Sequence, residues 1–172
     1  LGLDITVVEL ANRLLPRQVD VKGAKIFEAG IEAQGIKLIK GNAVKMVIGH
    51  HKAEAVQLMD GRKIEADLVI ISAGIVSDGH IADVAELEYE RSIVVNEHMQ
   101  TSDVKIYAAG DVAQHGDKNY AIWPEAVEQG NVAGANAVGD TLVYEDFIPS
   151  NVFNGIGLNV FSIGQVNYDD ES

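Results

Sequence analysis

The sequence contains no cysteine, and it has no apolar run that approaches the ~20 residues of a membrane-spanning helix. The absence of cysteine excludes disulfides, thiolate zinc sites and a catalytic thiol among these 172 residues. The chain also opens without the basic stretch and small-residue cleavage site of a secretory signal peptide. We therefore expect a cytoplasmic protein that does not span a membrane.

Basic residues and prolines are scarce as well. The chain has 13 Lys and Arg against 26 Asp and Glu, which gives a net charge of −13. This charge argues against nucleic acid or an anionic membrane as a partner, since both would repel the chain. Only three prolines occur beside 17 glycines and 47% hydrophobic residues, so a globular, turn-rich chain of one or two domains is expected.

The first 74 residues predict an α/β arrangement with a small meander. A β-branched strand over residues 4–9, a helix over 19–34 with Gly35 as its cap and a strand over 36–41 would form a parallel βαβ unit. The turn signals that follow predict a small antiparallel meander, with strands at residues 43–48, 53–58 and 63–65. The nearly continuous apolar run "DLVIISAG" (67–74) predicts a central parallel strand that is buried on both faces.

The remaining residues predict shorter elements. Residues 78–90 are weakly helical, "SIVVN" predicts a strand, and "TSDVKIYAAGDVAQ" (101–114) predicts a turn, a short apolar strand and an Ala-Gly-Asp corner. Pro124 fits the first turn of a helix on which small residues recur at helical spacing. These small residues are Ala126, Gly130, Ala133 and Ala137. The tail, residues 144–168, predicts further strands.

Two carboxylates occupy positions where a nucleotide or sugar alcohol could bind. Glu9 ends the first strand, where an acid can accept hydrogen bonds from a ribose; the alternative is a solvated acid at a strand end. The glycine-rich phosphate loop that normally precedes such an acid by about 20 residues does not fit into the eight residues before it. Asp111 follows Gly110, and a ligand could approach this pair closely; the alternative is an ordinary β-turn.

Taken together, four segments resemble one family in order and spacing. "TSDVKIYAAGD" (101–111) is similar to the second flavin-binding signature of the FAD-dependent pyridine nucleotide-disulfide oxidoreductases, and "DITVVELANRLLPR" (4–17) to their NAD segment. "ADLVIISAG" (66–74) is similar to the strand that ends near the nicotinamide, and "YAIWPEAVEQGNVAGANAVG" (120–139) to the helix beneath the flavin. The chain most resembles the NADH-dependent branch, which holds rubredoxin reductases, NADH oxidases and the flavoprotein part of nitrite reductases.

The resemblance implies FAD and NAD as cofactors and gives roles to single residues. Asp111 would bind the ribityl chain, with Gly110 clearing its path, while Glu9 would hold the NADH ribose and Gly74 would leave room for the nicotinamide arm. The first turn of the following helix would approach the isoalloxazine with its backbone N–H groups; this turn consists of Trp123, Pro124, Glu125 and Ala126. "SAGIVSDG" lacks the Pro-Asn that is common in the family after this glycine. No residue is assigned an acid–base role, and no metal site is expected.

The resemblance also implies the fold and the domain organisation. It implies an α/β, partial Rossmann-like (FAD/NAD(P)-binding) fold with a small antiparallel β meander, as a fragment lacking the N-terminal FAD domain. Residues 1–97 would belong to the NAD-binding domain, 98–140 to the FAD-binding domain and 141–172 to a truncated interface domain.

The parent would pass a hydride from NADH to FAD and electrons on to a protein or small-molecule acceptor. The chain alone would be inactive and would self-associate through unpaired strand edges. Two alternatives stay open: a non-catalytic folded or dimerising module, and an unrelated Rossmann-type nucleotide-binding transferase.

Overall fold

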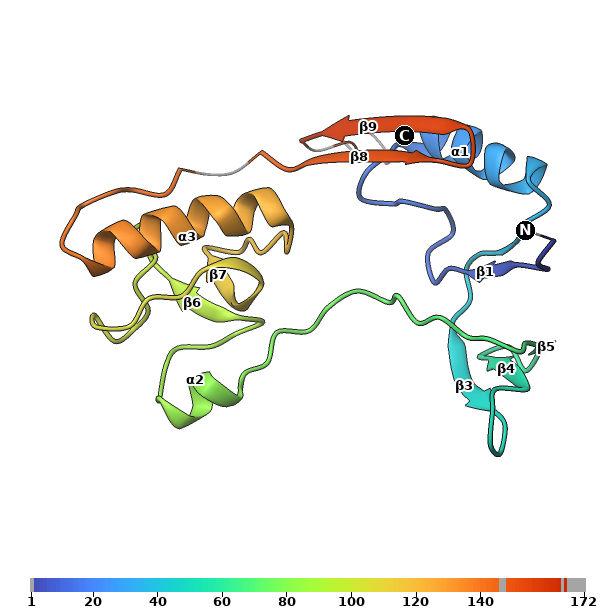
Figure 1. Ribbon diagram of the computed structural model, residues 1–172, viewed down its shortest axis with the longest axis horizontal. Helices are drawn as coiled ribbons and strands as arrows, with labels where there is room; N and C mark the ends of the chain where they lie inside the picture. Colours follow the sequence, from blue (N-terminus) through green and yellow to red (C-terminus); the bar gives the residue numbers. More distant parts are fainter. Residues whose placement is uncertain (1, 146–147, 165, 167–172) are drawn as a thin grey trace. The chain divides into compact units, whose positions relative to one another are not determined.

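The first strand, helix and second strand form the predicted parallel unit. The computed structural model describes residues 2–145, 148–164 and 166. Strand β1 (Thr6–Val8) pairs in parallel with β2 (Lys37–Ile39). Helix α1 (Val21–Ala33), which Figure 1 labels together with β1, connects the two strands. The helix begins at Val21 because the Asp20 carboxylate accepts a hydrogen bond of 2.7 Å from the Gly23 N–H. It ends before Gly35, which has a φ of +79° and so allows the chain to turn away.

The apolar face of α1 packs on a hairpin from the other end of the chain. Strands β8 (Ser150–Gly155) and β9 (Leu158–Ile163) pair antiparallel beside the helix. The rings of Phe27 and Phe153 meet edge to face at a centroid distance of 5.0 Å. Leu158 packs so close to Gly30 that a Cβ on this residue would clash with its side chain. The predicted helix is therefore confirmed, and Gly30 allows the hairpin to approach it closely.

The meander is also confirmed. Strands β3 (Val44–Ile48), β4 (Ala55–Leu58) and β5 (Lys63–Glu65) form an antiparallel sheet in that order. The turn between β3 and β4 contains His50 and His51, whose rings stack at 4.6 Å. Within the part of the chain that the structure describes, no three His, Asp or Glu side chains are grouped to hold a metal ion.

The predicted central strand at residues 67–74 is wrong for this structure. The segment forms no strand, and Leu68, Ile70 and Ile71 are 77%, 82% and 77% exposed. A central parallel strand needs hydrogen-bonding neighbours on both sides. Among the described residues, β1 pairs only with β2, and no strand pairs with this segment. Its apolar side chains are therefore left in solvent.

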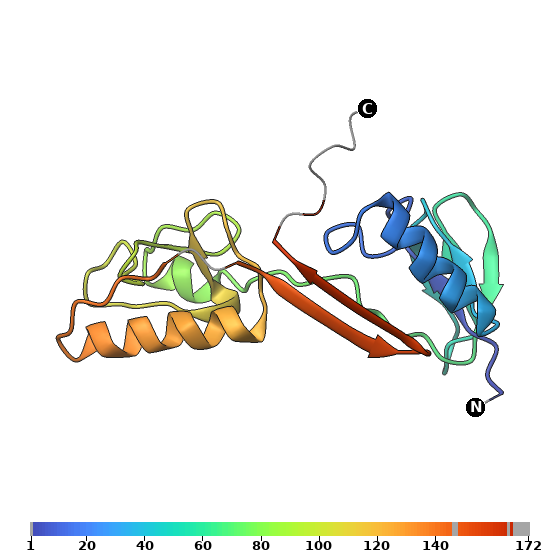
Figure 2. The ribbon, with the colours of Figure 1, turned by 90° about the horizontal axis from the view of Figure 1, so that it is seen from above.

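A second group of short elements follows. Helix α2 (His80–Val84) is shorter than predicted, and β6 (Ile93–Val95) pairs in parallel with β7 (Ala113–His115). Helix α3 (Trp123–Ala137) is the long helix of this group (Figure 2). Its Val132 and Ala133 belong to the same core as Ile93 and Val95 of β6. The short strand predicted before the Ala-Gly-Asp corner is reduced to one bridge between Gln100 and Tyr107. Pairing instead resumes after the corner, in β7.

The elements belong to two compact units. The first unit comprises Leu1–Ser72 and Ser150–Ser172, and the second comprises Ala73–Pro149. The core of the first unit contains Leu14, Phe27 and Ile31, while that of the second lies between α2, β6, β7 and α3. In the part of the chain that the structure describes, none of the helices has both the length and the hydropathy of a membrane-spanning helix.

Candidate functional site

The Gly110–Asp111 turn lies against the first turn of α3 in the second unit. Gly110–Val112 forms a 3-10 turn, and the φ of Gly110 is +77°, a conformation that side chains other than glycine rarely adopt. A Cβ at Gly110 would lie 3.3 Å from the Cβ of Ala126 on α3. Glycine is therefore required both by the backbone and by the close approach of the helix.

The amide of the turn is held by a buried side chain of α3. The Gly110 N–H donates to Oε1 of Gln129 at 2.8 Å, and Gln129 is only 1% exposed. Nε2 of Gln129 donates in turn to Oε1 of Glu125, one helical turn earlier, at 3.3 Å. A chain of two hydrogen bonds thus connects the start of α3 to the turn.

Glu125 is a buried carboxylate at the start of this chain. It is 4% exposed, and it accepts hydrogen bonds from the Tyr120 N–H at 3.1 Å and the Tyr144 hydroxyl at 3.3 Å. Burial raises the pKa of the Glu125 carboxyl; the bonds from Tyr120, Tyr144 and the Ala121 N–H offset this only in part, and the negative charge of Asp111 raises it further. The sequence predicts only a backbone contribution from Glu125, so the role of its side chain was missed.

The carbonyl of Asp111 is fixed while its carboxylate is left open. The Ser77 hydroxyl donates to this carbonyl at 2.6 Å, and Nδ2 of Asn119 donates to it at 3.0 Å. The carboxylate is exposed and, in the described part of the chain, has no hydrogen bond or ion pair. The turn therefore presents two carboxylate oxygens that are free to accept hydrogen bonds.

The exposed start of α3 borders this turn. Trp123 is 82% exposed, Pro124 lies in the first turn as predicted, and no side chain caps the helix at Ile122. The predicted stripe of small residues is only partly buried, because Gly130 and Ala137 face solvent. The buried face of α3 consists instead of Glu125, Gln129, Val132, Ala133 and Asn136.

The other two predicted site residues, Glu9 and Gly74, each have surroundings that the structure describes. Glu9 follows β1 in the first unit, where its Oε1 accepts from the Ala11 N–H at 2.8 Å. Gly74 lies in the second unit with a φ of +90°, and nothing lies within 4 Å of the position that its Cβ would take. The structure thus brings together Gly110, Asp111 and the first turn of α3, and the roles assigned to Glu9 and Gly74 stay predictions.

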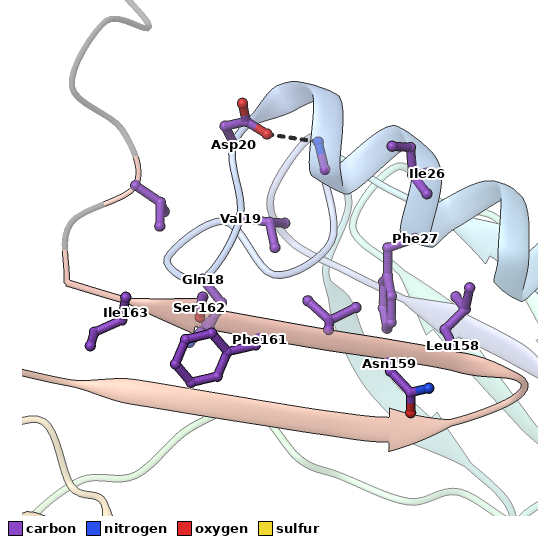
Figure 3. Close-up of a pocket in the computed structure, with 13 residues that line it drawn as sticks. Gln18, Val19, Asp20, Ile26, Phe27, Leu158, Asn159, Phe161, Ser162 and Ile163 are labelled. Carbon is purple, nitrogen blue, oxygen red and sulfur yellow. Dashed lines mark hydrogen bonds between the residues drawn. The ribbon is translucent and has the colours of Figure 1, made fainter.

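The first unit contains a cavity of about 600 Å³ between α1 and the β8–β9 hairpin (Figure 3). Its lining is mainly apolar, with Val19, Phe27 and Leu158 among the contributors. Among the described residues that line it, the one carboxylate is that of Asp20, which accepts from the Gly23 N–H as the cap of α1. None of the predicted site residues lines this cavity.

The βαβ unit with an acid directly after β1 is typical of Rossmann-like nucleotide-binding proteins. Residues 1–130 match the family model described as pyridine nucleotide-disulphide oxidoreductase, and the chain belongs to this family. This confirms the family that the four sequence segments indicate.

Relatives and solved structures agree with this assignment. The chain is 31% identical over 172 residues to a nitrite reductase [NAD(P)H] of Bacillus subtilis, covering 99% of this chain and 21% of that protein. It is 30% identical over 158 residues to the NADH-rubredoxin oxidoreductase of Clostridium acetobutylicum, covering 92% of this chain and 38% of that protein. The structure of an FAD-dependent pyridine nucleotide-disulphide oxidoreductase from Desulfovibrio vulgaris matches with a TM-score of 0.88 and 26% identity, over 96% of this chain and 44% of that one. The predicted partial Rossmann-like α/β fold is thereby confirmed, and the chain spans less than half of each of these proteins.

Proposed function

We propose that this chain is part of an NADH-dependent FAD oxidoreductase that passes a hydride from NADH to FAD and electrons on to a protein or small-molecule acceptor. In this enzyme, residues 1–97 would contribute to the NAD-binding domain, 98–140 to the FAD-binding domain and 141–172 to an interface domain. Family membership supports this proposal, as do the names of the relatives, which include an NADH-rubredoxin oxidoreductase and a nitrite reductase. A cytoplasmic setting stays a prediction from composition.

The observation that carries the proposal is the open carboxylate of Asp111 on its fixed turn. A carboxylate with two free oxygens fits the hydroxyl groups of a ribityl chain, and Gly110 keeps bulk away from the path of that chain. The adjacent start of α3 has no side-chain cap, and its positive dipole end suits the negative charge of a reduced flavin ring. When bound, FAD supplies the acceptor for the hydride of NADH. The residues present therefore fit the ribityl and ring portions of the cofactor.

The pyrophosphate of FAD would need residues beyond these. The sequence holds no G-x-G-x-x-G loop, and its charge of −13 disfavours a phosphate held without such a loop. We therefore expect the 172-residue chain alone to bind neither cofactor productively. The exposed Leu68, Ile70 and Ile71 favour a second role for the chain alone, as a self-associating module.

Flavin titration tests this function. It is carried out on the 172-residue chain alone and on the complete polypeptide of which we propose it is a part. The complete polypeptide should purify yellow, and NADH should bleach its flavin absorbance. The chain alone should purify colourless, leave the fluorescence of added FAD unchanged and elute as an assembly larger than a monomer. Micromolar binding of FAD by a monomer of the chain, or a colourless complete polypeptide that takes up no FAD, would contradict the proposal.

Glu9 is expected to favour NADH over NADPH in the complete polypeptide. A carboxylate at the ribose would bond the 2′-hydroxyl of NADH and repel the 2′-phosphate of NADPH. A hydrogen bond to a charged group contributes about 1.5–3 kcal/mol, so Glu9→Ala should weaken NADH binding roughly ten-fold or more. Glu9→Gln keeps an oxygen that can accept from the Ala11 N–H, so the backbone after β1 should stay in place. The loss of the charge should reduce the ratio of NADH affinity to NADPH affinity.

Titration of both nucleotides against these variants provides the measurement. Glu32→Ala, at an exposed position of α1, is the matched control for the loss of one carboxylate. An unaltered nucleotide preference in both Glu9 variants would remove Glu9 from the site.

A further inference from the structure

Three side chains from separate segments close a ring of hydrogen bonds on the Asp111 carbonyl. Because a carbonyl only accepts, the Ser77 hydroxyl must donate to it, at 2.6 Å. The Ser92 hydroxyl, 2.7 Å from that of Ser77, must then donate to Ser77. Nδ2 of Asn119 donates to Ser92 at 2.7 Å and to the Asp111 carbonyl at 3.0 Å, which completes the ring.

The ring fixes the turn at the opposite end from Gln129. Gln129 accepts from the Gly110 N–H, and the ring donates to the carbonyl of the next residue. The backbone that carries the Asp111 carboxylate is thus held on both sides. Ser92, at 2% exposure, anchors the ring in the interior.

The ring also connects the turn to the loop that contains Gly74. Ser77 lies three residues after Gly74, in the segment "SAGIVSDG". Its own carbonyl accepts from the Tyr89 hydroxyl at 2.8 Å, so this end of the loop is held as well. One hydroxyl therefore joins a loop proposed to lie near the nicotinamide to a turn proposed to lie at the ribityl chain.

We propose that the ring formed by Ser77, Ser92 and Asn119 is a positioning element that aims the Asp111 carboxylate at the ribityl hydroxyls of FAD. This inference rests on the proposed function and adds three residues to the flavin site that do not touch the cofactor. Ser77 is the critical member, because its hydroxyl is the only one of the three that comes from the loop of Gly74. Without it, the Asp111 carbonyl keeps a single side-chain donor, Asn119.

Ser77→Ala in the complete polypeptide should raise the FAD dissociation constant about five- to ten-fold, since one net hydrogen bond is lost from the turn. Ser77→Thr keeps the hydroxyl and should restore binding to within about two-fold of the wild type. Ser102→Ala is the matched control, because the Ser102 hydroxyl accepts from the Glu88 N–H at 2.9 Å within the same unit but lies outside the ring. This variant should leave the FAD dissociation constant unchanged.

A double-mutant cycle with Asp111→Ala decides whether Ser77 acts through the carboxylate. If it does, Ser77→Ala should have almost no effect on FAD binding once the Asp111 carboxylate is absent. Urea unfolding of each variant separates this from a general loss of stability. Equal effects of Ser77→Ala with and without the Asp111 carboxylate, or equal effects of the Ser77 and Ser102 substitutions, would overturn the positioning role. A wild type that binds no FAD would instead contradict the proposed function.

Discussion

Asp111→Ala in the complete polypeptide is expected to weaken FAD binding by about a hundred-fold or more while leaving the stability of the fold nearly unchanged. Two carboxylate oxygens can each accept a charge-assisted hydrogen bond from the ribityl chain, and such bonds contribute about 1.5–3 kcal/mol each. Among the described residues, no side chain or backbone group forms a hydrogen bond or ion pair with this carboxylate. Its removal therefore costs the ligand a partner without costing the protein one.

Flavin content after dialysis, followed by a fluorescence titration with FAD, measures the effect. Asp111→Asn keeps one accepting oxygen and should give an intermediate loss. Asp140→Ala, at an exposed position after α3, is the control for the loss of one negative charge. An Asp111→Ala protein that retains its full flavin content would show that the ribityl chain binds elsewhere.

Local patterns predicted the elements whose neighbours are close in sequence. Helix α1 follows from the spacing of Ala24, Phe27 and Ile31, which are all buried in the structure. The meander follows from turn signals at Gly49 and Gly61, because antiparallel strands that are joined by short turns pair with the next strand in the sequence. In both cases the residues that form an element also determine what it packs or pairs with.

The segment at residues 67–74 shows where such reasoning fails. Its composition is that of a strand buried on both faces, but a pattern of apolar residues cannot supply the strands beside it. Leu68 and Ile70 are therefore exposed in a segment that lacks partners among the described residues. To form the predicted strand, this segment would need neighbouring strands to bond its backbone and apolar side chains to cover its two faces.

The site divides in the same way. Gly110 and Asp111 could be predicted because the two residues are adjacent in the sequence, and the glycine turn and the carboxylate can both be recognised there. The residues that hold the turn could not, since Ser77 lies 34 positions from Asp111 and Gln129 lies 19 positions from Gly110. The sequence pattern of α3 points the wrong way for two of these residues. Glu125 and Gln129 stand one helical turn apart, and polar residues at this spacing ordinarily indicate the solvent-facing side of a helix. Both are buried because each bonds a backbone N–H, and sequence does not show that.

Glu125→Ala is expected to lower the free energy of unfolding by about 3 kcal/mol. The substitution removes the acceptor of the Tyr120 N–H and of the Tyr144 hydroxyl, and it leaves Gln129 without its partner on α3. Each buried polar group that loses its acceptor costs about 1–3 kcal/mol. Urea unfolding of the variant measures this, with Glu128→Ala on the exposed side of the same helix as control. A change below 1 kcal/mol would show that these bonds are replaced by water.

Glu125→Gln adds a pH dependence whose sign follows from the raised pKa of the Glu125 carboxyl. In the folded state this group binds its proton more tightly than in the unfolded chain, where its ordinary pKa is 4.5. Between 4.5 and the raised pKa of the folded state, the native protein therefore holds the extra proton, and the free energy of unfolding falls as pH rises. The glutamine does not titrate, so the stability of the variant relative to wild type should increase with pH across this window and level off above it. Urea unfolding of both proteins at a series of pH values, with Glu128→Gln beside them, provides the comparison. A difference between Glu125→Gln and wild type that falls with rising pH would mean that the buried carboxylate is stabilised in its charged form by the N–H groups around it.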